Sequence, residues 1–179
     1  LISGGHTEIV HIEKWGSYSI LGQTRDDAVG EAFDKVARML GLPYPGGPSL
    51  SKLAEIETSQ TDNSPEIRLP RPMLHSKDLD FSFSGLKTSV LYTIRDLKTE
   101  LNENIKIKIA KEFQDSVVET LVHKTEKSLI ESGAKSLIIA GGVISNTKIR
   151  EAFSNLIKNK YPHISLFIPE KNMATDNAV

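Results

Sequence analysis

The sequence predicts an α/β fold with parallel strand pairing, and two patterns carry this prediction. The last third of the chain has an uninterrupted apolar run over 136–140, a glycine turn, a helical pattern and a second apolar run over 164–168. Continuous apolar runs joined by a helix are typical of buried parallel strands. Residues 26–40 add an amphipathic helix, because their apolar side chains recur at intervals of three and four. With 39% hydrophobic residues, a chain of 179 residues can build one sizeable core.

Two strands are expected first, followed by that helix. The stretch from Leu1 to Ile12 is β-rich but broken by Gly4-Gly5, and residues 17–21 form a second strand. Thr24 or Asp26 can cap the helix over 26–40, and Gly41 ends it. Its apolar stripe is Val29, Ala32, Phe33, Val36, Ala37 and Leu40, and its polar face holds Asp27, Glu31, Asp34, Lys35 and Arg38.

The middle of the chain is expected to alternate loops with helices. Pro45-Gly46-Gly47-Pro48 predicts a sharply turned loop, with Pro48 opening a short helix that contains Leu50, Leu53 and Ala54. Residues 58–72 form a polar surface loop, and residues 81–84 form a half-buried strand that Gly85 ends. Further helices are expected over 86–97, over 106–131 with Gly133 as its stop, and from about Ser145 onward.

The composition excludes several kinds of site. The 22 Lys+Arg nearly balance the 23 Asp+Glu, which argues against strong autonomous binding to a phosphate backbone. No run approaches the ~18 apolar residues of a membrane helix. Without cysteine there is no disulfide, thiolate nucleophile or cysteine-ligated metal. The five histidines show no metal-site spacing. Because the chain opens at Leu1 without an initiator Met, we expect a piece of a longer protein.

Three glycine pairs stand where a strand meets a turn or a turn meets a helix: Gly4-Gly5, Gly46-Gly47 and Gly141-Gly142. Each pair either closes a tight turn or lets the backbone approach a ligand and point N–H groups at an anion or a nucleobase. Three such pairs favour a nucleotide as the ligand, although neither a P-loop nor a dinucleotide fingerprint occurs.

Three polar residues have both a structural and a functional interpretation. Asp34 either forms an i,i+4 ion pair with Arg38, as Glu31 does with Lys35, or accepts hydrogen bonds from ribose hydroxyls. Asn146 either caps the helix that follows it, or uses its amide to contact an adenine or ribose edge. Asp176, in Thr175-Asp176-Asn177, is by default a helix-capping residue.

Six motifs in a fixed order are more specific than any one of them. They are Ser3-Gly4-Gly5-His6-Thr7, Gly30-Glu31-Ala32-Phe33-Asp34-Lys35, Tyr44-Pro45-Gly46-Gly47-Pro48, Phe81-Ser82-Phe83-Ser84-Gly85-Leu86-Lys87, Ala140-Gly141-Gly142-Val143 with Asn146, and Thr175-Asp176-Asn177-Ala178. This series, over essentially the whole chain, resembles the universal tRNA threonylcarbamoyladenosine transferase family.

The resemblance implies a fold and a reaction. The fold is that of actin, Hsp70 and the sugar kinases, in which a nucleotide lies between two ribonuclease-H-like lobes. The reaction transfers the threonylcarbamoyl group from threonylcarbamoyl-adenylate to the exocyclic amine of the adenosine beside the anticodon, in tRNAs reading codons that start with A. The partners implied are tRNA, this adenylate and accessory proteins of the modification complex, in the cytoplasm and with no membrane.

The resemblance also assigns residues. Leu1, Ile2, Ser3, Gly4 and Gly5 would lie against the phosphate and acyl end of the substrate. Asp34 and Gly47 would hold the ribose and nucleoside, and Asn146 would lie by the adenine. Asp176 would bind one divalent metal, iron or zinc, whose two histidine ligands belong to the N-terminal lobe of the family. Ser51 stands where relatives often carry an acidic residue.

The resemblance further implies that this chain is a fragment. Residues 1–169 would be the second lobe, and residues 170–179 the start of the return to a first lobe that the chain lacks, so the fragment alone is expected to be inactive. Two other functions remain open for such a fold: a non-catalytic nucleotide-binding scaffold and a sugar-kinase-like phosphotransferase. The lysines and arginines of 68–77 and 106–111 are interpreted as solvated faces.

Overall fold

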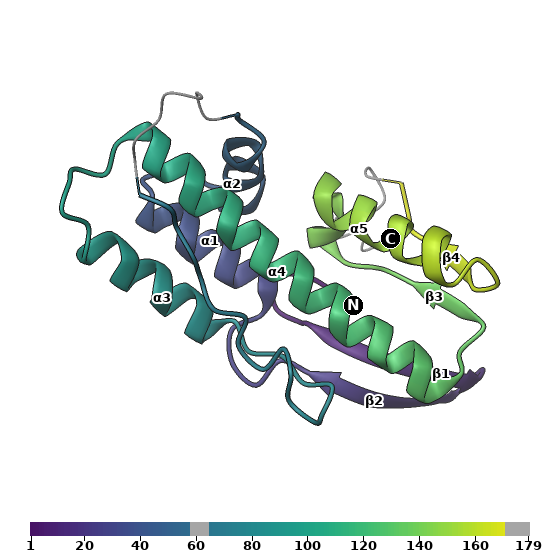
Figure 1. Ribbon diagram of the computed structural model, residues 1–179. Helices are drawn as coiled ribbons and strands as arrows, with labels where there is room; N and C mark the ends of the chain where they lie inside the picture. The colour runs from purple at the N-terminus through teal and green to yellow at the C-terminus, as the bar shows by residue number, and fades with distance from the viewer. Residues whose placement is uncertain (58–64, 171–179) are drawn as a thin grey trace.

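The computed structural model describes residues 1–57 and 65–170 (Figure 1). An antiparallel hairpin of β1 (Glu8–Lys14) and β2 (Ser17–Gln23) is followed by α1 (Val29–Met39) and α2 (Gly46–Ala54). Then come α3 (Ser84–Arg95) and α4 (Glu103–Ser132). The described chain ends with β3 (Ser136–Ile138), the 3-10 turn η1 (Gly142–Ser145), α5 (Thr147–Lys160) and β4 (Ser165–Phe167).

In the part of the chain that the structure describes, the strands form two small sheets, which the backbone of Ile2 links. β1 pairs with β2, and β3 pairs with β4 in parallel, which confirms the predicted parallel strand–helix–strand unit. The N–H of Ile2 donates to the carbonyl of Ala140 at 2.8 Å, and the carbonyl of Ile2 accepts from the N–H of Val143 at 3.2 Å. The segment before β1 is thereby held beside the segment that follows β3.

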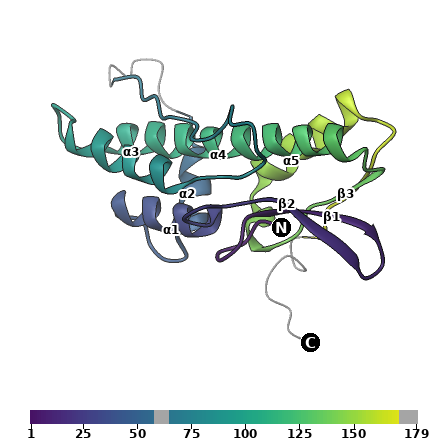
Figure 2. The ribbon, with the colours of Figure 1, turned by 90° about the horizontal axis from the view of Figure 1, so that it is seen from below.

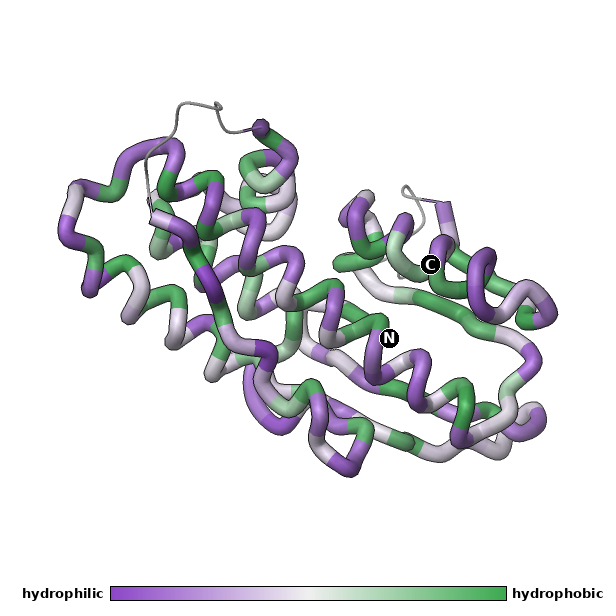
Figure 3. Tube along the Cα trace, in the orientation of Figure 1, coloured by the Kyte–Doolittle hydropathy of each residue, from purple (hydrophilic) through white to green (hydrophobic). Residues whose placement is uncertain are grey.

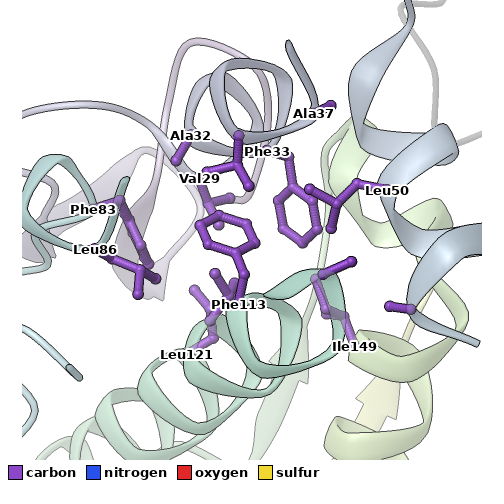
Figure 4. Close-up of a cluster of buried hydrophobic side chains, with 14 of the residues drawn as sticks. Val29, Ala32, Phe33, Ala37, Leu50, Phe83, Leu86, Phe113, Leu121 and Ile149 are labelled. Atoms are coloured by element: carbon purple, nitrogen blue, oxygen red, sulfur yellow. The ribbon is translucent and has the colours of Figure 1, made fainter. Parts of the chain in front are cut away.

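The 30-residue helix α4 runs past all of these elements (Figures 1 and 2). At 1.5 Å per residue it is about 45 Å long. It packs against α2, α3, α5 and β1. The core lies between α4 and the predicted stripe of α1, where the rings of Phe33 and Phe113 meet edge to face at 5.1 Å (Figure 4). Leu50, Phe83 and Ile149 bring α2, the start of α3 and α5 into the same cluster.

Apolar and polar segments alternate along the helices (Figure 3). Accordingly, within 1–57 and 65–170, no helix combines the length and the apolar character needed to cross a membrane. Both glycine stops are confirmed: Gly41 and Gly133 follow α1 and α4 with φ of 73° and 63°, the left-handed conformation that favours glycine.

The predicted start of α1 is wrong by three residues, because its predicted caps are used elsewhere. The helix begins at Val29, whose N–H donates to Thr7 Oγ1 at 2.9 Å. The carboxylate of Asp26 instead accepts from the N–H groups of Phe83 and Ser84, at 2.8 and 3.0 Å. Thr24 Oγ1 donates to the carbonyl of Asp27. Asp26 therefore stabilises the start of α3.

Three other boundaries also differ from prediction. Residues 81–84 form no strand, since only Phe81 makes a bridge, to Thr24, and Gly85 lies inside α3. α2 begins at Gly46, so Gly46-Gly47 is the first turn of the helix and not part of the loop before it. α4 begins at Glu103 because Asn102 Oδ1 accepts from the N–H of Ile105 at 3.0 Å, a side-chain cap.

Candidate functional site

A pocket of about 650 Å³ opens between α1, α2 and the η1–α5 segment. α1 contributes lining residues from Gly30 onward, and α2 with the residue before it contributes them from Pro45 onward. The opposite wall runs from Gly142 to Thr147. The lining residues are Gly4, Gly30, Phe33, Asp34, Pro45, Gly47, Pro48, Ser51, Lys52, Glu55, Gly142, Val143, Ser145, Asn146 and Thr147.

The pocket gathers four of the eight predicted substrate-binding residues: Gly4, Asp34, Gly47 and Asn146. The other four predicted residues do not line the pocket. Ile2 is buried in the core, and Ser3 and Gly5 complete the turn around Gly4. Leu1 lines a second hollow, of about 470 Å³, between β1, β3 and the last turns of α4.

Asp34 bridges α1 and α2. Its Oδ1 accepts from the N–H of Gly47 at 3.0 Å, in the first turn of α2, where a negative charge is favourable. Within the described residues Asp34 makes no ion pair with Arg38, whereas the predicted pair of Glu31 and Lys35 is present at 2.7 Å. Asp34 Oδ2 has no partner in that same part of the chain, so it remains available to a ligand.

The close approach of α2 to Asp34 depends on glycine at position 46. A Cβ at Gly46 would lie 2.8 Å from Asp34 Cα and 2.7 Å from Ala37 Cβ, far inside van der Waals contact. Gly30 has the same role on the other side, since a Cβ there would lie 2.9 Å from both Gly4 Cα and Ser3 O. The glycines of these motifs therefore bring backbone segments together around the pocket.

The turn before β1 uses most of its own N–H groups. Ser3 Oγ accepts from the N–H of Gly5 at 3.3 Å and from that of His6 at 3.0 Å, a local side-chain turn. The carbonyl of Ser3 accepts from the N–H of Gly30 at 3.2 Å, and Thr7 Oγ1 holds Val29. The N–H of Gly4 has no partner among the described residues, and Gly4 is the member of this turn that lines the pocket.

Asn146 is the cap of α5, as one of its two interpretations predicts. Its Oδ1 accepts from the N–H of Ile149 at 3.0 Å. Its Nδ2 donates to Ser51 Oγ and to Gln114 Oε1, both at 2.7 Å. Both amide hydrogens are thus engaged, and one lone pair of Oδ1 remains for a ligand. Asn146, the cap of α5, thereby joins α2 and α4 at the wall of the pocket.

A cluster of charged side chains holds the segment that leads into α1. Asp27 lies between Lys35, at 2.8 Å, and Lys87, at 3.2 Å. Partial burial would raise the pKa of Asp27, but the two lysines outweigh this and hold the pKa below its usual range. The N–H of Asp27 also donates to Ser84 Oγ at 3.3 Å, so the start of α3 supports the start of α1.

The sequence is similar to one family over its whole length. The family model described as TsaD, tRNA N6-adenosine threonylcarbamoyltransferase, matches residues 1–179. The chain belongs to this family. A curated family member from Herminiimonas arsenicoxydans is 48% identical over 177 residues, covering 99% of this chain and 50% of the relative. Members from Chromobacterium violaceum and Neisseria meningitidis are 47% and 44% identical and are covered to 51% and 53%.

The chain therefore spans about half the length of the curated threonylcarbamoyltransferases it matches. Among solved structures, the crystal structure of T. kodakarensis HypF is similar, with a TM-score of 0.55 and 16% identity over 86% of this chain and 18% of HypF. At that identity the likeness concerns the fold alone.

Sequence reasoning did not single out two charged residues that line the pocket, Lys52 and Glu55, nor Gln114, which does not line the pocket but accepts a hydrogen bond from Asn146. A signal for the first two exists, since positions 48, 51, 52 and 55 recur as one face of a helix. Gln114 carries no such signal, because its role depends on the packing of α4 against α5. The predicted metal ligand Asp176 lies outside the described residues, and inside them no three His, Asp or Glu side chains gather to bind a metal.

Proposed function

We propose that this chain forms the nucleotide-binding part of an enzyme that transfers a threonylcarbamoyl group from threonylcarbamoyl-adenylate to the exocyclic amine of the adenosine beside the anticodon, in tRNAs reading codons that start with A. The supporting observation is that Gly4, Asp34, Gly47 and Asn146, which are far apart in the sequence, line one pocket in a chain of this family.

The pocket residues suit an adenylate. The free Oδ2 of Asp34 can accept from ribose hydroxyls while Oδ1 remains on Gly47. The free N–H of Gly4 lies on the same pocket and can donate to the phosphate or to the oxygen that gains charge during acyl transfer. The substrate is a mixed anhydride and already activated, so the chain needs no covalent nucleophile.

The proposal includes the architecture of the whole enzyme. We propose an actin/Hsp70/sugar-kinase-like fold with residues 1–169 in the second lobe, and tRNA and accessory proteins as partners in the cytoplasm. We also propose one divalent metal, iron or zinc, with Asp176 as a ligand. The described residues form no metal-binding cluster of their own, so the remaining ligands would come from outside them. A chain with only one lobe would be inactive alone.

The test uses the complete enzyme that contains this chain, with its accessory proteins, threonylcarbamoyl-adenylate and unmodified tRNA. Mass spectrometry of the digested tRNA should detect the threonylcarbamoylated adenosine. Asp34→Asn keeps an acceptor for Gly47 but loses the charge on the ribose side, and should lower kcat/KM about 10-fold or more. Arg38→Gln, one turn along the exposed face of α1, is the matched control and should not change it. Absence of product, beside an active control enzyme, would refute the proposal.

A further inference from the structure

One helix face supplies most of one wall of the pocket. Pro48, Ser51, Lys52 and Glu55 recur at intervals of three and four along α2 and its C-cap, which is Glu55, and all of them line the pocket. This row of four residues starts beside Gly47, whose N–H donates to Asp34. It ends with the ammonium of Lys52 and the carboxylate of Glu55, which are one helical turn apart.

The two ends of the pocket differ in what they offer a nucleotide. Gly4 and Asp34 lie at the end where the proposed function places the phosphate and the ribose. Lys52 and Glu55 lie farther along α2, beyond the turn whose Ser51 accepts the hydrogen bond from Asn146. A nucleotide whose ribose meets Asp34 and whose phosphate meets Gly4 therefore has its base directed toward Lys52, Glu55 and Asn146.

Most side-chain donors at that end are already occupied. The hydroxyl of Ser51 donates to the carbonyl of Gly47 at 2.9 Å, and that of Ser145 to the carbonyl of Gly142 at 2.8 Å. Both hydrogens of Asn146 Nδ2 are engaged. By contrast, Lys52 and Glu55 are exposed and have no side-chain partner in the part of the chain that the structure describes.

We propose that Lys52 and Glu55 determine the base specificity of the pocket, as a donor and an acceptor that together select adenine. Adenine presents the acceptor N7 beside the donor N6 amine, so Lys52 can donate to N7 while Glu55 accepts from the amine. Guanine presents two acceptors, N7 and O6, on the same edge, and O6 would face the carboxylate of Glu55. The carboxylate therefore attracts one purine and repels the other.

This inference rests on the proposed function, because it needs a nucleotide in the pocket, and its test separates the two. Calorimetric titration of the full chain uses AMP and GMP as probes, with circular dichroism to verify that each variant is folded. The wild-type chain should bind AMP about 10-fold or more tightly than GMP, the discrimination expected of one well-placed pair of base contacts. Glu55→Lys should abolish or reverse this preference, since two lysines then face the two acceptors of guanine.

Further variants separate the two residues and provide controls. Glu55→Gln should reduce the preference, and Lys52→Met should weaken AMP binding by about 10-fold. Glu151→Lys and Lys158→Met make the same changes of charge on exposed positions of α5 outside the pocket, and should have no effect. A Glu55→Lys chain that keeps the wild-type preference, or a wild-type chain that binds AMP and GMP equally, would overturn the inference alone. A wild-type chain that binds neither nucleotide would overturn the proposed nucleotide site as well.

Discussion

Replacing Thr7 by valine would isolate the bond that joins the turn before β1 to the helix that lines the pocket. Thr7 is 1% exposed, and its Oγ1 accepts from the N–H of Val29, which is itself fully buried. Valine has nearly the same shape but no acceptor, so the N–H of Val29 would stay buried without a partner or water. An unsatisfied buried donor costs about 1–3 kcal/mol, and we expect Thr7→Val to lower the free energy of unfolding by about 2 kcal/mol.

Urea unfolding followed by circular dichroism at 222 nm would measure this loss, with an unchanged dependence on urea concentration indicating that the denatured state is the same. Thr7→Ser is the matched control, because it keeps the hydroxyl and loses only a methyl group. Because serine keeps the acceptor for the N–H of Val29, our prediction is that the serine variant is the more stable of the two. A valine variant as stable as the wild type, or more stable than the serine variant, would refute it.

Three further predictions concern the glycine at position 141, the charge of Asp27 and the hydrogen bond between Gln114 and Asn146. Gly141→Ala should lower the free energy of unfolding in urea by about 2–3 kcal/mol, more than Gly133→Ala does. Both glycines have positive φ, but only at Gly141 would an added Cβ lie 2.3 Å from a backbone oxygen, that of Ile2. Equal losses in the two variants would contradict this. The folded-state pKa of Asp27 is lowered, so its contribution is present above the ordinary pKa of about 4 and disappears as the pH falls through the folded value. Asp27→Asn should therefore be less stable at pH 7 and lose less stability than the wild type between pH 5 and pH 2, and an unchanged pH slope would exclude this role. Gln114→Met should weaken AMP binding in titration calorimetry while Gln114→Glu retains it, because only glutamate preserves an acceptor for Asn146; retention of affinity by the methionine variant would contradict this.

The helices could be predicted from the sequence because their patterns are local. The stripe from Val29 to Leu40 recurs at the helical period, and Gly41 and Gly133 take the left-handed conformation for which glycine is suited. The start of α1 could not be predicted in this way. From the sequence, Asp26 is suited to cap α1, but tertiary structure directs its carboxylate to the N–H groups of Phe83 and Ser84. A residue that can cap two helices is assigned by the packing between them.

The candidate site, too, could be predicted where its patterns are local and could not where it depends on packing. The glycine motifs indicated the pocket, because close backbone approach leaves a visible requirement for glycine at positions such as 30 and 46. Asp34 illustrates what is missed: its spacing to Arg38 favours an ion pair, but the carboxylate accepts from Gly47, thirteen residues away. Lys52 and Glu55 were visible as part of a helical face, yet only the packing of α1 and α5 shows that this face borders a pocket.

The length of α4 also has a consequence for how the molecule opens. A two-stranded sheet is marginal on its own, and within residues 1–57 and 65–170 each sheet has two strands. Because α4 packs against β1 as well as against α2 and α5, the walls of the pocket rest on the same helix as the hairpin. Native-state hydrogen exchange should therefore find the amides of α4 and of the elements packed on it protected by one shared opening, so that the pocket loses its shape when α4 unfolds and not before.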